Sequence, residues 1–285
     1  MLAIVLALAS AIGYGGSDFA AGLAARSAPV IQITLLVSVV SAVVVAAALP
    51  FAASPGPSMV ALAWGFAAGL GGTLGAFALY LGFRHAAFSV AGPLSAVASA
   101  GFSVLAGLLY GERPTALALT GIALALPAIV GVSASAASGG GESAGKPLAG
   151  VVYGLVAGAC FALLFIGLDR AGSRSGLWPV AAASAGELAC ALVAAVAVRS
   201  FALCGGRARL LAAIAGAAGA SGTILFFYAT HRGFLAVTAV LTSLYPAATI
   251  ALARTVLGER LTALRLGGLA LAGVCVALIA SGGAG

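Results

Sequence analysis

The chain has 285 residues, of which 63% are hydrophobic and only 7% are charged, and its formal net charge is +7. A soluble domain carries about 25% charged residues, so a soluble fold of this composition would expose apolar surface over its whole exterior. The basic residues are spread singly and gather on no one face, which argues against a nucleic-acid partner. The composition therefore indicates an integral membrane protein, with the lipid bilayer as its main partner.

Long apolar segments with short connections predict ten transmembrane helices. No charged residue lies between Arg26 and Arg84, and such a gap holds two spans of roughly 20 residues. Helices are expected because a spanning segment must satisfy its own backbone polar groups, and the alternating pattern of barrel strands is missing. The expected ranges are 2–22, 29–50, 59–82, 87–110, 114–134, 148–168, 177–198, 209–230, 234–256 and 262–281.

One motif occurs twice. Residues 111–125 read GERPTALALTGIALA and residues 258–272 read GERLTALRLGGLALA, with eleven of fifteen positions identical at an offset of 147. Locally the motif predicts a turn at the membrane surface: glycine is favoured just past a helix C-terminus, and Pro114 suits the first turn of the fifth span. Glu112 is then expected near the positive end of that next helix. A direct role in handling substrate is the alternative.

The offset of 147 extends over both halves of the chain. It aligns Gly69 with Gly216 and Tyr14 with Phe161. We therefore predict an all-α integral membrane protein with ten transmembrane helices as two five-helix inverted-topology repeats, at 1–136 and 148–285, joined by a flexible linker at 137–147. The second repeat is inverted because five is an odd number of crossings, an arrangement found in many secondary transporters.

The chain resembles the drug/metabolite transporter (DMT) superfamily, in its ten-helix form built from two EamA-type domains. The resemblance rests on GYGGSDFAAG at 13–22, GERPTALALTGIALALPAIV at 111–130 and YPAATIALARTVLGERLTALRLGGLALAGV at 245–274. In that family a proline usually stands about thirteen residues before the glutamate of the turn. Pro246 fits this pattern, whereas the first half has Ser99 at the equivalent position.

The resemblance implies a transporter that exports small metabolites such as amino acids and lies in a bacterial cell (inner) membrane as a multi-pass protein. It also implies a central cavity surrounded by helices one, three, four, six, eight and nine, and cytoplasmic termini. The basic residues in the connections favour external termini instead, so the orientation stays open. A monomer and a homodimer both fit the sequence.

Glu187 is the first candidate site residue. It lies near the middle of the seventh span, in ASAGELACAL, with no basic residue within ten positions. A charged side chain inside a membrane is costly unless it faces protein or a water-filled cavity. We expect either a protonation switch that couples H⁺ to solute movement or a neutral glutamate that joins helices by hydrogen bonding.

A second polar group lies on the first span, where Tyr14, Ser17 and Asp18 share one helical face at i, i+3 and i+4. This face either meets a polar solute or holds Asp18 in an ion pair. The arginines available for that pair are Arg26, Arg84 and Arg254.

Hydroxyl groups also recur at helical spacing on two repeat-related spans. Ser95 and Ser99 lie on the fourth span, and Thr242 and Tyr245 lie on the ninth. Such groups either line a cavity or bond to backbone carbonyls of their own or a neighbouring helix. If the family's cavity carries over, its aromatic walls are Tyr80, Phe161, Phe165, Phe227 and Tyr228.

Catalytic and metal-binding signatures are missing from the sequence. It has no phosphate-binding loop, no nucleophile elbow and no metal-ligand spacing among its four cysteines. We therefore expect no enzyme, no cofactor and no metal. The two functional hypotheses are a secondary transporter, with coupling to H⁺ open, and a passive facilitator or channel with the same fold.

Overall fold

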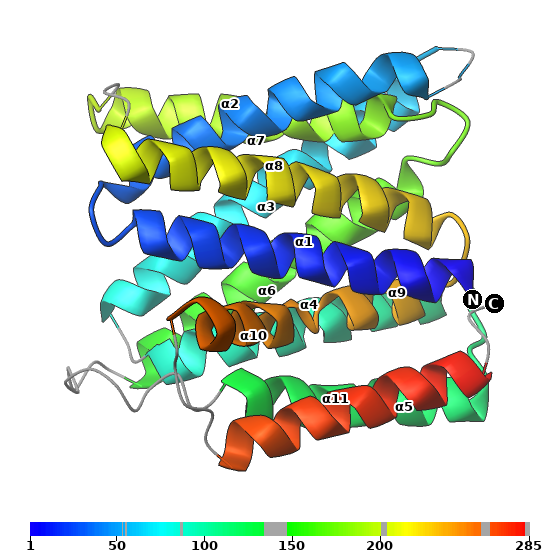
Figure 1. The fold of residues 1–285 in the computed structure, drawn as a ribbon. Coiled ribbons are helices and arrows are strands. Elements are labelled where there is room, and N and C mark those ends of the chain that lie inside the picture. Colours follow the sequence, from blue (N-terminus) through cyan, green and yellow to red (C-terminus); the bar gives the residue numbers. More distant parts are fainter. Residues whose placement is uncertain are drawn as a thin grey trace.

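The computed structural model describes residues 1–52, 54, 56–85, 88–133, 147–200, 204–257 and 263–282. They form a bundle of helices whose ends lie at two opposite faces, and both termini lie at the same face (Figure 1). The helices are α1 Leu2–Ala24, α2 Val30–Ala48, the short η1 Leu49–Phe51, α3 Met59–His85, α4 Phe88–Leu109, α5 Ala116–Ser133, α6 Pro147–Arg170, α7 Trp178–Ala197, α8 Gly206–Thr230, α9 Leu235–Thr242, α10 Tyr245–Leu257 and α11 Ala263–Gly282.

The predicted all-α membrane fold is confirmed. Within the described residues, seven helical segments are long and apolar enough to cross a membrane, and the segment Leu235–Val256 contains both α9 and α10. Apolar stretches of α4, α5 and α11, at Leu94–Leu109, Ala116–Gly131 and Leu266–Gly282, fall in the fourth, fifth and tenth predicted ranges. A helix therefore occupies each of the ten ranges, and in the fourth, fifth and tenth ranges these helices are α4, α5 and α11.

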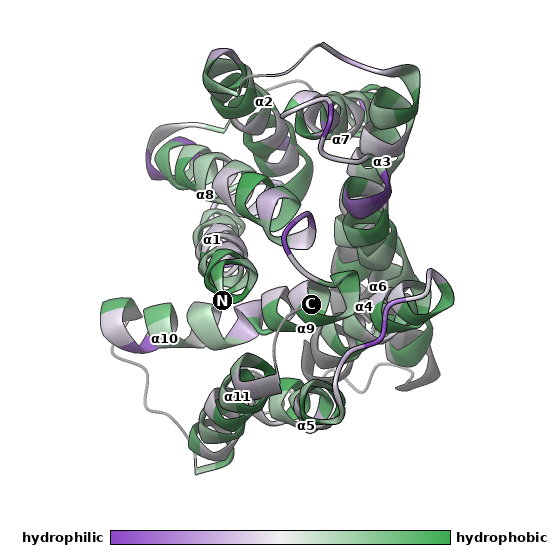
Figure 2. Cartoon of the chain, turned by 90° about the vertical axis from the view of Figure 1, so that its right-hand side faces the viewer, coloured by the Kyte–Doolittle hydropathy of each residue, from purple (hydrophilic) through white to green (hydrophobic). Residues whose placement is uncertain are grey.

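The helices of the two halves of the chain interlock. α1 packs mainly on α8, α3 on α6, and α5 on α11, so each of these contacts joins a helix before residue 134 to one after residue 147. Viewed from the end where α1 begins, α1, α2 and α8 lie on one side and α3, α4 and α6 on the other (Figure 2). The interior is thus built from both halves.

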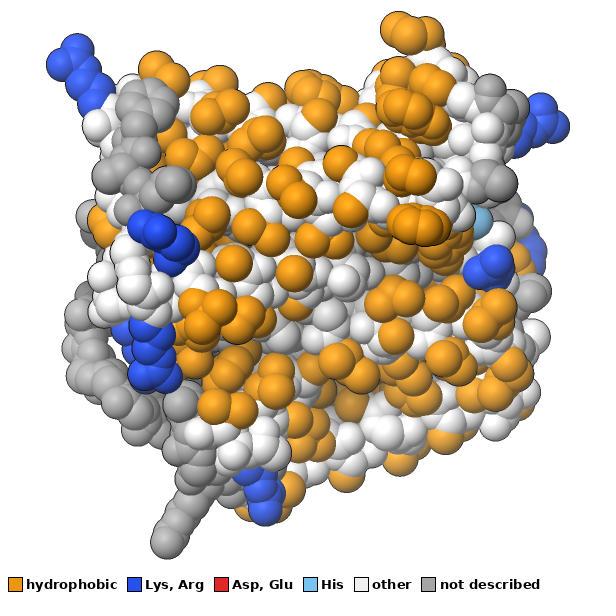
Figure 3. Space-filling model, turned by 45° about the horizontal axis from the view of Figure 1, so that its top comes forward, with side chains coloured by type: hydrophobic (Ala, Val, Ile, Leu, Met, Phe, Trp, Pro, Cys, Tyr) orange, Lys and Arg blue, Asp and Glu red, His pale blue; other side chains and the backbone are white. Residues whose placement is uncertain are grey.

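The outer surface suits lipid. Hydrophobic side chains are spread over the middle of one face, while Lys and Arg side chains lie near its two ends (Figure 3). Val43, Val193 and Leu210 expose more than half of their surface. Apolar side chains on the outside cost nothing in hydrocarbon, and the basic side chains at the ends can reach the headgroup layer.

The predicted ninth span is interrupted between Thr242 and Tyr245, where α9 ends and α10 begins. Pro246 explains the break, because proline has no N–H to donate to the carbonyl of Thr242 and disfavours helical backbone at the preceding residue. In α4 the equivalent residue is Ser99, and that helix continues without a break. The departure from the family pattern therefore has a visible consequence in the fold.

The turn after α4 follows the prediction in one respect and corrects it in another. Gly111 has a φ of 93°, and the N–H of Glu112 donates to the carbonyl of Gly107 at 3.0 Å, as expected for a glycine that ends a helix. The placement of Pro114 in the first turn of α5 was wrong. Thr115 caps that helix instead, because its Oγ1 accepts from the N–H of Ala118 at 3.2 Å, and Pro114 lies outside it.

Glycines allow α3 and α7 to touch through their backbones. A Cβ atom added to Gly69 would collide with the carbonyl of Ala183, and one added to Gly65 would collide with the carbonyl of Pro179. Small residues permit such close approach of membrane helices. Gly65 and Gly69 therefore serve the packing of α3 on α7.

Gly69→Ala should lower the stability of the fold, by about 1–3 kcal/mol, because α3 and α7 must move apart to admit the methyl group. Gly273→Ala in α11 is the matched control, since a Cβ there meets no atom within 4 Å. Thermal unfolding of both variants in detergent measures the difference. Equal melting temperatures for the two variants would contradict the contact at Gly69.

Candidate substrate site

Tyr14 lies at the centre of a polar and aromatic group between α1, α6 and α8. Its hydroxyl lies 3.0 Å from the Oγ1 of Thr223 on α8, and its ring centroid lies 6.5 Å from that of Phe165 on α6. Phe165 is buried, and its ring centroid lies 4.5 Å from that of Phe226. Phe161, one turn earlier on α6, lies against Gly75 of α3. The face of α1 that carries Tyr14 is therefore directed toward the interior of the bundle.

Asp18 lies one helical turn after Tyr14, and its side chain is exposed. Its carboxyl group lies within electrostatic range of the Tyr14 side chain. An exposed carboxyl on this helix faces either lipid, which is costly, or water inside the protein. Since it lies on the same face as Tyr14, the interior is the favourable placement. Ser17, beside it, approaches Gly219 of α8: a Cβ there would lie 3.1 Å from the Ser17 Oγ.

Among the described side chains, no ion pair joins Asp18 to Arg26 or Arg254 within 4.0 Å. Arg26 and Arg254 are both exposed. The third arginine considered, Arg84, has a side chain outside the described residues. The pairing alternative is therefore left without support among the arginines whose side chains are described.

Glu187 brings α7 into the same region. Its Oε2 accepts a hydrogen bond from the Oγ of Ser41 on α2 at 3.4 Å, and Ser41 in turn lies 3.5 Å from the Oγ of Ser184. A Cβ at Gly72 of α3 would lie 3.8 Å from its Oε1. The Glu187 carboxyl also lies within electrostatic range of the Tyr14 side chain. Tyr14, Asp18 and Glu187 therefore form one polar group, which we call the central polar group.

The hydroxyls of α4 and α9 lie in a tightly packed interface. Ser99 donates to the carbonyl of Ala96 at 3.0 Å and lies 3.4 Å from the Oγ of Ser243. Thr242 is fully buried and donates to the carbonyl of Ala7 on α1 at 3.3 Å. These contacts match the alternative in which hydroxyls bond to backbone or to a neighbouring helix.

The remaining candidates lie in several places. Ser95 is fully buried, and Tyr245 packs against the core formed by α1, α5, α9 and α11. Tyr228 lies near the end of α8, where the guanidinium of Arg232 stands 5.6 Å from its ring centroid. The side chain of Tyr80 lies outside the described residues.

The sequence predicted the wrong helix as the partner of Glu112. Its carboxylate does not serve α5. It accepts from the backbone N–H of Leu235 at 2.5 Å and of Ala236 at 2.9 Å, the first two residues of α9. Burial raises the pKa of this carboxyl above its ordinary value, the two N–H donors oppose that shift, and Asp169 adds to it. The carboxylate therefore caps a helix 123 residues further along the chain.

Two further residues of this region were not predicted from the sequence. Thr223 and Ser41 are ordinary small polar residues in apolar helices, and no spacing sets them apart. Their partners Tyr14 and Glu187 are 209 and 146 residues away along the chain. Within the described residues, no three His, Cys, Asp or Glu side chains come together in a way that could hold a metal ion.

Comparison with known proteins supports the sequence resemblance. Residues 1–134 match the model of the EamA-like transporter family, which confirms the resemblance over the first five predicted spans. One solved structure, titled only "Crystal structure of protein", matches with a TM-score of 0.72 over 95% of each chain at 19% identity. At that identity it shows a shared fold alone. No curated protein matches the chain.

The bond between Tyr14 and Thr223 should couple α1 to α8 energetically. We expect a double-mutant cycle of Tyr14→Phe and Thr223→Val to give a coupling energy of about 0.5–1.5 kcal/mol, the usual net value of one hydrogen bond. Unfolding in mixed detergent micelles measures it. Strictly additive effects of the two substitutions would show that this bond does not form.

Proposed function

We propose that the chain is a membrane transporter of the EamA-like type, because residues 1–134 match the model of that family, and that it is a secondary carrier that exports small metabolites, amino acids among them. Two halves of the chain would expose a shared site to each side of the membrane in turn. The central polar group is the observation that carries this proposal.

The helix contacts support two equivalent halves. In the repeat, α1, α2 and α3 correspond to α6, α7 and α8. The repeat therefore relates the contact between α1 and α8 to a contact between α6 and α3, and the structure contains both contacts. The pairing of α2 with α8 becomes that of α7 with α3, and both occur as well. Such equivalence is what an alternation between two states requires, since each half takes over the role of the other.

The central polar group supports a solute site between these halves. Tyr14 and Asp18 come from the first half, and Glu187 comes from the second. Sites for small molecules combine apolar walls with a few polar groups, and Phe165 provides an aromatic wall beside Tyr14. Because intramembrane carboxyl groups are costly, two of them within electrostatic range of one tyrosine favour a functional role over a packing role.

Glu187 is the candidate for coupling to H⁺. Among the described residues its hydrogen-bond donor is a neutral hydroxyl, that of Ser41. A carboxyl held in this way is able to gain and lose a proton without breaking an ion pair. We propose that its protonation and the binding of solute alternate, so that H⁺ moves in one direction and solute in the other.

Purified protein in liposomes tests the proposal with a panel of labelled amino acids and small metabolites. An acid interior should drive concentrative uptake of at least one of them. Flux that only equilibrates would support the alternative, a passive facilitator. No flux of any solute would contradict a carrier for the solutes tested.

Glu187→Gln should abolish uptake driven by a proton gradient while exchange of solute for solute persists, because glutamine keeps an acceptor for Ser41 but does not titrate near neutral pH. Counterflow and gradient-driven uptake in the same liposomes measure the two rates. Glu142→Gln, the same change in the predicted linker, is the control. Gradient-driven uptake that survives Glu187→Gln would rule out this residue as the coupling group.

A further inference from the structure

α9 differs from every other described helix because none of its surface is exposed. All eight of its residues, Leu235–Thr242, are 0% exposed, whereas each other described helix exposes residues. It contacts α1, α4 and α5 of the first half and α6 and α8 of the second. A membrane helix that touches no lipid is enclosed entirely by protein, so α9 fills the middle of the bundle.

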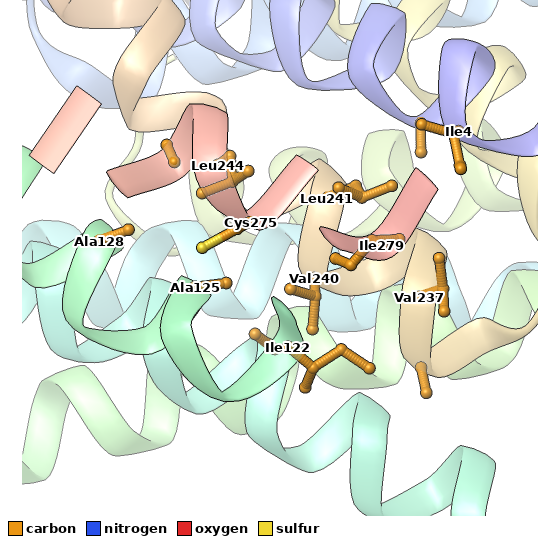
Figure 4. Packing of buried hydrophobic residues seen from close by; sticks show 14 of the residues in the cluster. Ile4, Ile122, Ala125, Ala128, Val237, Val240, Leu241, Leu244, Cys275 and Ile279 are labelled. Atoms are coloured by element: carbon orange, nitrogen blue, oxygen red, sulfur yellow. The ribbon is translucent and has the colours of Figure 1, made fainter. Parts of the chain in front are cut away.

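α9 lies toward the end of the bundle where α1 begins (Figure 1). From that end it is seen among α1, α4 and α5 (Figure 2). Its side chains Val237, Val240 and Leu241 belong to an apolar cluster that includes Ile122 of α5 and Ile279 of α11 (Figure 4). The contacts of these side chains are apolar, whereas Thr238 and Thr242 of α9 donate to backbone carbonyls.

The N-terminus of α9 is capped by a residue from another part of the chain. Its N-cap residue, Phe234, offers no capping side chain, and the carboxylate of Glu112 supplies that function from the turn after α4. A carboxylate at a helix N-terminus satisfies free N–H groups and interacts favourably with the helix dipole. Nearby, the guanidinium of Arg170 on α6 lies 4.4 Å from the ring centroid of Tyr110, which follows α4. Both contacts join the two halves at this end.

The end of α9 is separated from α10. Ser243 still donates to Ala239, but Leu244 donates to Leu241, three residues back, so the last turn is tight and the helix stops. With Pro246 following, no continuous ladder of backbone hydrogen bonds transmits the motion of α9 to α10. A short rigid segment with such a break can move as a unit.

We propose that α9 is a movable plug that closes the transport path at the end where α1 begins, with Glu112 as its latch and the break before Pro246 as its hinge. The inference rests on the proposed alternating access. In the structure the Glu112 carboxylate accepts from both N–H groups, which corresponds to the closed state in this proposal. Opening of this end releases the two N–H groups of α9 from the Glu112 carboxylate.

Labelling of a buried cysteine tests the latch. In a background without the four native cysteines, Ala239→Cys should react slowly with a water-soluble maleimide, because Ala239 is 0% exposed. Adding Glu112→Gln should raise the rate about fivefold, the population shift expected when one capping interaction of ~1 kcal/mol is lost. Glutamine keeps a single acceptor oxygen, so the start of α9 is only partly released.

Two controls accompany this measurement. Glu142→Gln makes the same charge change in the predicted linker and should leave the labelling rate of Ala239→Cys unchanged. Ser173→Cys, in the exposed loop after α6, should react equally fast with and without Glu112→Gln. An unchanged slow rate at Ala239→Cys in folded Glu112→Gln protein would overturn the proposal.

Hydrogen exchange of the wild-type protein provides a test that does not depend on any variant. If α9 swings out as a unit, its amides should exchange faster than those of α11, although α9 is more deeply buried. Exchange of α9 that is as slow as that of α11 would also overturn the plug. Neither assay needs a solute, so a mobile α9 in a protein that carries nothing would refute the carrier alone, and a static α9 in an active carrier would refute the plug alone.

Discussion

Polar groups inside a membrane have no water to bond with, and this constraint governs the structure at every level. It requires that the apolar segments be helices, since a helix satisfies its own backbone. It also explains why hydroxyls deep in the bundle bond to protein: Ser10 donates to the carbonyl of Gly222 at 2.8 Å, and Thr249 donates to the carbonyl of Gly15 at 3.1 Å. Each of these bonds joins one half of the chain to the other.

The same constraint separates groups that hold the fold together from groups that are available for function. Thr242 and Ser99 have their hydroxyls engaged within packed interfaces. Asp18 is different because it is an exposed residue, and among the described residues the hydrogen-bond donor to Glu187 is a neutral hydroxyl, that of Ser41, at 3.4 Å. Because carboxyl groups inside a membrane are costly, these two residues are the candidates for the proposed solute site.

Glu112 shows how a correct observation about the sequence led to a wrong partner. The repeated glycine-glutamate-arginine turn does end α4 at Gly111, and the glutamate does meet a helix N-terminus. The helix that it meets is α9 and not α5. The fourth span of one half and the ninth span of the other pack together, and sequence proximity contains no information about that contact. The internal repeat relates these two spans, and it was the sequence feature that could have predicted their contact.

The sequence by itself determined the membrane location, the helical class, the approximate ranges of the ten helical segments and the similarity of residues 1–134 to EamA-like transporters, because hydrophobic length, glycine, proline and a matched motif act over a few residues. It also singled out Glu187 and Asp18, since carboxyl groups in apolar helices are rare. Only the tertiary structure decided that Tyr14 and Glu187 share one region and that α9 is wholly enclosed. These facts depend on contacts between segments more than 100 residues apart, which are set by the packing of whole helices and not by any local pattern.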